Sequence, residues 1–145
     1  MRLSIKQGRI RVVLDTNIIV SALIAKQGAS AAIFEEIVTG KIENYTCKEI
    51  IEELKEVFER KEITKRTDNK ARTFVLENYL ENSVMIAKKT EIKLAEHESD
   101  NKFIETAVDA DADYVVSGDH HLINLKKFMD IKIVKPKEFL DKLKI

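Results

Sequence analysis

The strongest constraint on the fold is a short apolar run that ends abruptly in polar residues. Residues 10–14 read Ile-Arg-Val-Val-Leu, and the polar residues Asp15, Thr16 and Asn17 follow directly. The β-branched run predicts a buried strand, and the polar residues predict the turn at its end. Helical periodicity begins at once, over residues 18–23. A strand that leads straight into a helix is typical of a βαβ unit, in which successive strands run parallel.

Strand and helix patterns alternate along the rest of the chain. Further strands are predicted near residues 45–47, 83–87, 114–117 and 131–134, and helices over residues 30–40, 48–60, 68–82, 100–112 and 136–143. Residues 60–72 are interpreted as a mobile connection between helices. The alternation predicts an α/β fold, a three-layer α/β/α sandwich with a central, mainly parallel sheet. Because no repeat, linker or break in composition is present, residues 1–145 are expected to form a single domain.

Composition bounds the class of protein. The 145 residues are 44% hydrophobic and 34% charged, with four glycines and one proline, which excludes collagen-like and largely disordered chains. Cys47 is the single cysteine, and its short apolar surroundings favour a packing residue. No apolar run reaches the length of about 18 residues that a membrane span needs, and residues 1–10 lack the apolar core of a secretion signal. We therefore expect a cytoplasmic protein with no membrane partner.

The formal net charge of zero hides an uneven distribution of charge. Residues 91–121 carry nine acidic and two basic side chains, whereas residues 60–72 carry six basic and two acidic ones, and residues 122–145 seven and three. The basic side chains of interest are Arg60, Lys61, Lys65, Arg66, Lys70 and Arg72, with Lys126, Lys127, Lys132, Lys135 and Lys137. Such segments can hold a phosphate backbone while divalent cations offset the acidic centre, so binding of a nucleic acid is expected to depend on metal and on salt.

Two aspartates follow predicted strands directly. Asp15 comes after the strand at residues 10–14, and Asp119 comes after the strand at residues 114–117. Ligands of open parallel sheets bind beyond the carboxyl ends of the strands, so both side chains are candidates for a functional site. Each is equally suited to form a turn or to cap a helix.

Helical spacing selects two further carboxylates. Of the four glutamates on the helix predicted over residues 48–60, Glu53 lies nearest the apolar stripe and is best placed to reach inward. The others, which are expected to face solvent, are Glu49, Glu52 and Glu56. Asp100 lies on the buried side of the helix predicted over residues 100–112. It is in the first turn, where the helix dipole stabilises a carboxylate by about 0.3 to 1 kcal/mol. Glu105 and Asp109 on that helix are expected to face outward.

Inward-facing carboxylates at one edge of a sheet repel one another unless they bind cations. Oxygen-rich sites of this kind suit Mg²⁺ or Mn²⁺. Such ions orient a water molecule and neutralise charge that develops on a phosphoryl oxygen. The carboxylates therefore predict hydrolysis of phosphodiester bonds.

Four segments together resemble the PIN-domain nuclease family: residues 12–17, 50–54, 100–107 and 112–119. By position, the acidic metal-binding residues of the family correspond to Asp15, Glu53, Asp100 and Asp119, and its small polar supporting residues to Thr16 or Asn17 and Ser117. The resemblance implies an α/β/α fold and cleavage of RNA that depends on Mg²⁺ or Mn²⁺. It also implies a prokaryotic toxin that pairs with an antitoxin protein and forms a homodimer.

One position departs from the family. Its members often carry a second acid two residues after Asp119, where this chain has His121, so the resemblance leaves open whether the site binds one or two metal ions. It also leaves open whether the substrate is RNA or DNA. His120 and His121 are candidates for phosphate contact or proton transfer, and no spacing of Cys and His favours zinc. Two alternatives remain: an inactive PIN-like module that binds RNA or protein, and a receiver-like phosphoacceptor domain, suggested by Val134-Lys135-Pro136.

Overall fold

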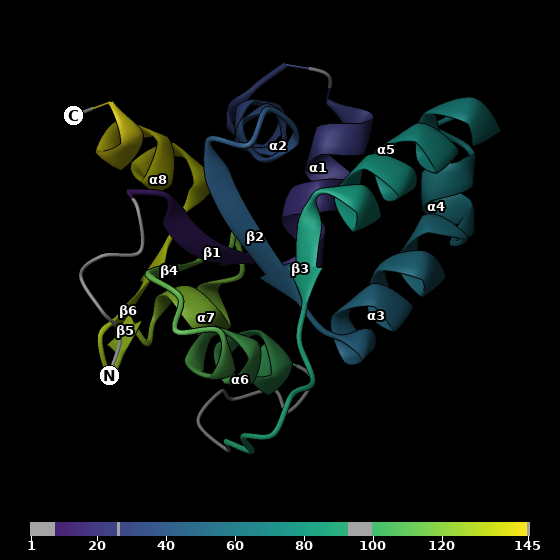
Figure 1. Ribbon diagram of the computed structural model, residues 1–145. Coiled ribbons are helices and arrows are strands. Elements are labelled where there is room, and N and C mark those ends of the chain that lie inside the picture. The colour runs from purple at the N-terminus through teal and green to yellow at the C-terminus, as the bar shows by residue number, and fades with distance from the viewer. Residues whose placement is uncertain (1–7, 26, 93–99, 145) are drawn as a thin grey trace.

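The computed structural model describes residues 8–25, 27–92 and 100–144 (Figure 1). Strands and helices alternate along these residues. In chain order the elements are β1 (Ile10–Leu14), α1 (Thr16–Ile24), α2 (Ala29–Val38), β2 (Ile42–Thr46), α3 (Lys48–Phe58), α4 (Lys61–Thr64), α5 (Asn69–Glu81), β3 (Ser83–Met85), α6 (Asn101–Asp109), β4 (Tyr114–Val116), α7 (His120–Ile123), β5 (Lys127–Phe128), β6 (Ile131–Val134) and α8 (Pro136–Leu143).

The strands form one sheet in the order β3-β2-β1-β4-β6-β5. All neighbouring strands pair in parallel except β5, which runs antiparallel to β6. At the centre of the sheet, Leu14 of β1 lies opposite Val116 of β4. The residues that follow these two strands, Asp15 and Ser117, therefore emerge side by side at the same edge of the sheet.

Helices cover both faces of the sheet and make three layers (Figure 1). Helices α1, α2, α5 and α8 pack on one face, and α6 and α7 pack on the other. The alternation of side chains along β1 serves both layers, because Val12 and Leu14 enter the first core and Val13 enters the second. Helix α3 contributes to both cores, since Leu54 belongs to the first and Ile50 to the second.

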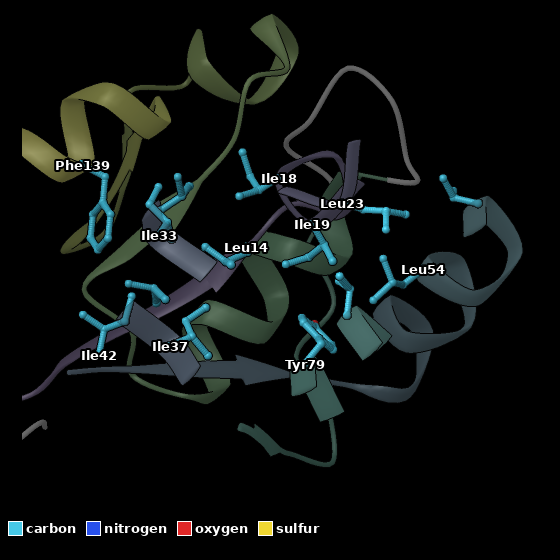
Figure 2. Packing of buried hydrophobic residues seen from close by; sticks show 14 of the residues in the cluster. Leu14, Ile18, Ile19, Leu23, Ile33, Ile37, Ile42, Leu54, Tyr79 and Phe139 are labelled. Carbon is cyan, nitrogen blue, oxygen red and sulfur yellow. The ribbon is translucent and has the colours of Figure 1, made fainter. Parts of the chain in front are cut away.

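The larger core includes Leu14, the last residue of β1 (Figure 2). Leu14, Ile18 and Ile19 are each at most 2% exposed and pack in the same cluster as Tyr79 of α5. Burial of each aliphatic side chain of this size contributes roughly 1.5 to 3 kcal/mol relative to exposure. This packing fixes the first turn of α1, and with it the backbone around Asp15.

The predicted α/β/α sandwich is confirmed, with shifts at the ends of its elements. Cys47 is fully buried, as its surroundings indicate, and directly precedes α3. Part of the predicted connection at residues 60–72 is helix α4, and the sequence patterns missed α7 and the two-residue strand β5. Within the described parts of the chain, no single helix has the length and apolar character to cross a membrane, and only the pair α1 and α2, bent by 103°, passes the same test together.

The expectation that Glu105 faces outward is wrong. Glu105 is 7% exposed, and its Oε1 lies 2.8 Å from Nζ of Lys88. The backbone N–H of Ile92 donates a 2.7 Å hydrogen bond to its other oxygen. The chain that follows β3 crosses this side of α6 and covers it, which the spacing within one helix cannot reveal. Asp109 is exposed as expected, but it accepts hydrogen bonds from the backbone of Lys89 and Thr90.

Candidate active site

Asp15 is fixed where β1 passes into α1. Its backbone N–H donates to the carbonyl of Val116 at 2.9 Å, which continues the pairing of β1 with β4 by one residue. The side chain caps α1, because Oδ1 accepts a hydrogen bond from the backbone N–H of Asn17 at 3.2 Å. Only 4% of Asp15 is exposed. The carboxylate thus has one defined position at the central edge of the sheet.

A single serine hydroxyl joins Asp15 to the segment that carries Asp119. Ser117 is fully buried, and its Oγ–H donates to Oδ2 of Asp15 at 2.6 Å. The same Oγ accepts a hydrogen bond from the backbone N–H of Asp119 at 2.9 Å. One hydroxyl therefore contacts the carboxylate of Asp15 and the backbone of Asp119, while the charges that act on Asp15 are those of Asp100 and Glu53.

The electrostatics of Asp15 place two further carboxylates near it. Burial raises the pKa of Asp15 above 3.8, while the hydrogen bonds from Ser117 and Asn17 act to lower it. The negative charges of Asp100 and Glu53 raise the pKa further. Carboxylates from α3 and from the residue preceding α6 therefore act on the aspartate at the end of β1.

Glu53 and Asp100 reach this region from two helices. Glu53 is half-buried on α3, whereas Glu49, Glu52 and Glu56 are exposed, as the helical spacing indicates. Asp100 occupies the N-cap position of α6, but its side chain accepts no capping hydrogen bond from that helix. Capping therefore does not account for the carboxylate at this position.

Lys102 is a member of this region that the sequence analysis missed. Its Nζ lies 2.7 Å from Oε2 of Glu53 and 4.8 Å from the centre of the Phe103 ring. The side chain is 14% exposed. One signal was available, because Lys102 is one of only two basic residues in the acidic stretch at residues 91–121.

Asp119 lies at the carboxyl end of β4 and caps the short helix α7. Its Oδ1 accepts a 2.8 Å hydrogen bond from the backbone N–H of His121. The rings of His120 and His121 pack against each other with centres 4.1 Å apart. Asp119 is therefore held both by its own turn and, through its backbone, by Ser117.

The small polar residues beside Asp15 play different parts. Asn17 contributes its backbone N–H, and its side chain is exposed. Thr16 is 3% exposed, and its Oγ1 has no hydrogen-bond partner within the described part of the chain. A buried hydroxyl without a partner is costly, so this oxygen suits a site that is completed by a ligand.

The donors in this region are chemically suited to a hard divalent cation. Carboxylate oxygens are the ligands that Mg²⁺ and Mn²⁺ prefer, and a bound cation would offset both the burial and the neighbouring negative charges that raise the pKa of Asp15. The unpartnered Oγ1 of Thr16 adds another oxygen next to Asp15. The residues present therefore fit a metal ion of this kind.

A mainly parallel sheet with acidic side chains beyond its central strands defines a class of α/β proteins whose ligands bind at the carboxyl ends of the strands. The chain belongs to the PIN domain family, a family of nucleases, whose model matches residues 11–121. It therefore does not represent a receiver domain.

Two comparisons with individual proteins agree with this assignment. The chain is similar to an uncharacterized protein of Methanocaldococcus jannaschii, with 34% identity over 142 residues that cover 92% of this chain and 91% of that protein. Its fold is similar to a chain in the crystal structure of VapBC2 from Rickettsia felis, bound to a DNA fragment from its promoter. That match has a TM-score of 0.59 and 13% identity, and it covers 87% of this chain and 98% of the other.

Proposed function

We propose that this protein is a cytoplasmic endoribonuclease that depends on Mg²⁺ or Mn²⁺ and hydrolyses phosphodiester bonds in RNA. The observation that carries the proposal is the buried carboxylate of Asp15, on which the charges of Asp100 and Glu53 act and to which the Ser117 hydroxyl donates while it also accepts from the backbone N–H of Asp119. Membership of a nuclease family supports the reaction class. Asp15, Glu53 and Asp100 come from separate places in the chain, so the action of the latter two on the buried Asp15 carboxylate is a property of the fold.

The residues that would hold the metal are Asp15, Glu53, Asp100 and Asp119. When bound, such a cation supplies a more acidic water molecule and neutralises charge on the phosphoryl group. Ser117 orients Asp15 and the turn of Asp119, and partners of this kind tune the affinity of a metal site. Thr16 places a second hydroxyl beside Asp15, and the backbone of Asn17 holds the other oxygen of that carboxylate.

The two basic segments supply the surface for RNA. Their side chains are exposed, apart from Arg72, whose guanidinium donates to the carbonyl and hydroxyl of Thr67. Helix α4, in the first segment, and the β5–β6 hairpin, in the second, lie at opposite sides of the molecule, with the central strands between them (Figure 1). We propose that a strand of RNA that contacts both segments passes the carboxyl ends of the central strands, where Asp15 lies.

The test is cleavage of single-stranded and hairpin RNA with Mg²⁺ or Mn²⁺, with DNA of the same sequence as a second substrate. We expect metal-dependent cleavage that is lost in Asp15→Asn and in Asp100→Asn, while circular dichroism shows both variants folded. Asp141→Asn is the matched control, because it changes an exposed aspartate on α8, outside the residues that we propose as metal ligands. If both site variants cut like the wild type, the assigned residues are wrong. If the protein binds RNA but cuts neither substrate with either metal, it is a binding module.

We further propose that the nuclease is the toxin of a toxin–antitoxin pair, forms a homodimer and is bound by its antitoxin. The toxin–antitoxin complex with a similar fold supports this proposal. A groove of about 680 Å³ lies between α1, α2 and α5, away from the acidic residues. It is lined mainly by apolar side chains such as Ala22, Phe34 and Phe74, and Phe74 is 63% exposed. An antitoxin segment with an apolar helix face fits such a groove.

The partner proposal is tested with the product of the reading frame directly upstream of this chain. Phe74→Lys is expected to weaken complex formation strongly, and Leu80→Lys, on the same helix but outside the groove, is expected to leave it unchanged. Light scattering of both variants without the antitoxin measures their oligomeric state. If Phe74→Lys instead converts a dimer to a monomer, the groove binds a second copy of this chain and the assignment to an antitoxin is wrong.

A further inference from the structure

Three consecutive residues with metal-binding side chains gather at the end of β4. Asp119, His120 and His121 each offer one ligand atom, and these three atoms lie within 4.8 Å of one another. Asp119 and His121 are half-buried, and His120 is exposed. Because the residues are adjacent in sequence, the spacing rules for zinc sites do not detect them.

The backbone brings these side chains together. Asp119 caps α7 through Oδ1, and its backbone N–H is held by Ser117, so the carboxylate has a fixed place. The two imidazoles belong to the first turn of α7 and lie against each other with an angle of 37° between their planes. No hydrogen bond or ion pair among the described residues engages Oδ2 of Asp119, which leaves one carboxylate oxygen for a ligand.

The distances suit a metal ion after a small movement. Metal bonds to imidazole nitrogen and carboxylate oxygen are about 2.0 to 2.2 Å long, so two ligands on opposite sides of one ion lie about 4.2 Å apart. The three ligand atoms lie within 4.8 Å of one another, which is slightly more than this distance. Rotation of an exposed imidazole about its side-chain bonds is enough to close the difference. His120 is exposed and has this freedom.

The chemistry of the donors selects the class of metal. A set of two imidazoles and one carboxylate suits Mn²⁺, Co²⁺, Ni²⁺ or Zn²⁺ more than Mg²⁺, which prefers oxygen ligands. Ser117 contacts both the carboxylate of Asp15 and the backbone N–H of Asp119, so the three residues lie next to the buried negative charge of Asp15. A site for transition metals thus lies next to a site for hard cations.

We propose that Asp119, His120 and His121 bind a transition-metal dication at the border of the acidic site. This inference rests on the proposed function only through Asp119, which both sites share. It makes the protein more responsive to Co²⁺ or Mn²⁺ than four carboxylates alone would be. It also gives the two histidines a role that the hydrolysis of RNA by the acidic residues does not require.

The test is binding of Co²⁺ to the full chain, followed by visible absorption and by paramagnetic broadening of the imidazole NMR signals. We expect Co²⁺ to broaden the signals of His120 and His121, assigned with the corresponding Ala variants. His120→Ala and His121→Ala should each weaken Co²⁺ binding at least about tenfold, a loss seen even for residues that only support a metal ligand. Asn124→Ala, at the end of the same helix, is the control and should bind Co²⁺ normally.

The same experiment separates this proposal from the nuclease assignment. In Asp15→Asn, cleavage of RNA should be lost while Co²⁺ still broadens both imidazole signals. Cleavage without any imidazole broadening would refute the histidine site and leave the nuclease assignment standing. Equal Co²⁺ binding by the wild type and by the double variant His120→Ala/His121→Ala would also refute the histidine site. Imidazole broadening in a protein that cuts no RNA with any metal would support the histidine site and refute the nuclease assignment.

Discussion

The Nζ of Lys102 lies 2.7 Å from Oε2 of Glu53, which puts a positive charge among the carboxylates that we assign to metal binding. Both side chains are at most 30% exposed, so water screens the pair less than it would at the surface. An ammonium group and a divalent cation repel each other and compete for the same oxygen. We therefore expect Lys102 to compete with the metal that we propose for Glu53.

Replacing Lys102 is expected to tighten metal binding. In Lys102→Met the ammonium no longer occupies Glu53 and no longer repels the incoming ion, so Mn²⁺ should bind severalfold more tightly. Electron paramagnetic resonance of free Mn²⁺ measures the affinity directly. Lys55→Met removes an equal charge from an exposed position on α3 and should leave the affinity unchanged. Weaker Mn²⁺ binding in Lys102→Met would show that the lysine supports the site.

Removing the shared hydroxyl is expected to weaken both metal binding and cleavage. Ser117→Ala takes a hydrogen bond from Asp15 and another from the turn of Asp119, and the loss of such supporting partners costs about 10- to 100-fold in metal affinity or activity. Calorimetric titration with Mn²⁺ and the rate of RNA cleavage check this result. Ser83→Ala is the control, since the hydroxyl of Ser83 bonds to Asn44 and Tyr79, and the variant should have lower thermal stability without a change in the affinity for Mn²⁺. Unchanged affinity in Ser117→Ala would remove Ser117 from the site.

The buried charge of Asp15 is expected to lower stability when no metal is bound. Burial raises the pKa of Asp15 in the folded protein, so between the unfolded value near 3.8 and the raised value the folded state binds more protons. Stability that Asp15 contributes below this window is therefore lost as the pH rises through it. Asp15→Asn removes the charge but keeps an oxygen to accept from Asn17, and should be more stable than the wild type at neutral pH without metal.

Thermal unfolding of the wild type and Asp15→Asn across acidic and neutral pH tests this prediction. The difference between the two proteins should be small below pH 3.8 and should grow as the pH rises, because all other carboxyl groups titrate in both. Added Mn²⁺ should raise the unfolding temperature of the wild type and leave that of the variant almost unchanged. Greater stability of the wild type at neutral pH without metal would contradict the electrostatic argument.

Two lysines that face each other across β5 and β6 are expected to contact RNA. Lys127 and Lys132 are paired in register and both exposed, and like charges directly opposite each other destabilise a sheet. The double variant Lys127→Gln/Lys132→Gln should therefore be at least as stable as the wild type but bind RNA less tightly. Each lost phosphate contact should reduce the salt dependence, the slope of log K against log salt concentration, by about 0.7.

Fluorescence anisotropy with labelled single-stranded RNA at several salt concentrations measures this slope, in an Asp15→Asn background that prevents cutting. The matched control is Lys142→Gln/Lys144→Gln, which removes two lysines at the end of the chain, outside this hairpin. An equal loss in both double variants would mean that only total charge matters. An unchanged slope in the hairpin variant would exclude it from the RNA surface.

Local patterns predicted those parts of the protein that depend on one element at a time. Asp15 followed from a strand that ends in a polar turn, and the half-buried position of Glu53 followed from the apolar stripe of α3. The contact between Lys102 and Glu53 joins two helices that are far apart in the sequence, so no single helix shows it. The burial of Glu105 has the same origin, because a separate segment covers that side of α6.

The shortest elements escaped prediction for another reason. Strand β5 has only two residues, which is too few for any alternation of side chains to appear. Helix α7 has four residues, of which His120 and His121 are polar, so no apolar stripe indicates a helix. No helix was therefore predicted over the two histidines that follow Asp119, although they lie in the helical turn in which the two rings pack together.

The ammonium group of Lys88 forms ion pairs with both α3 and α6. It lies 2.8 Å from Glu105 on α6 and 3.6 Å from Glu49 on α3. Glu53 lies one turn along α3 from Glu49, and α6 begins directly after Asp100. Lys88 thus joins the helix that carries Glu53 to the helix that begins after Asp100, so we expect a change at Lys88 to shift these two carboxylates relative to each other although Lys88 lies outside the residues that we propose as metal ligands.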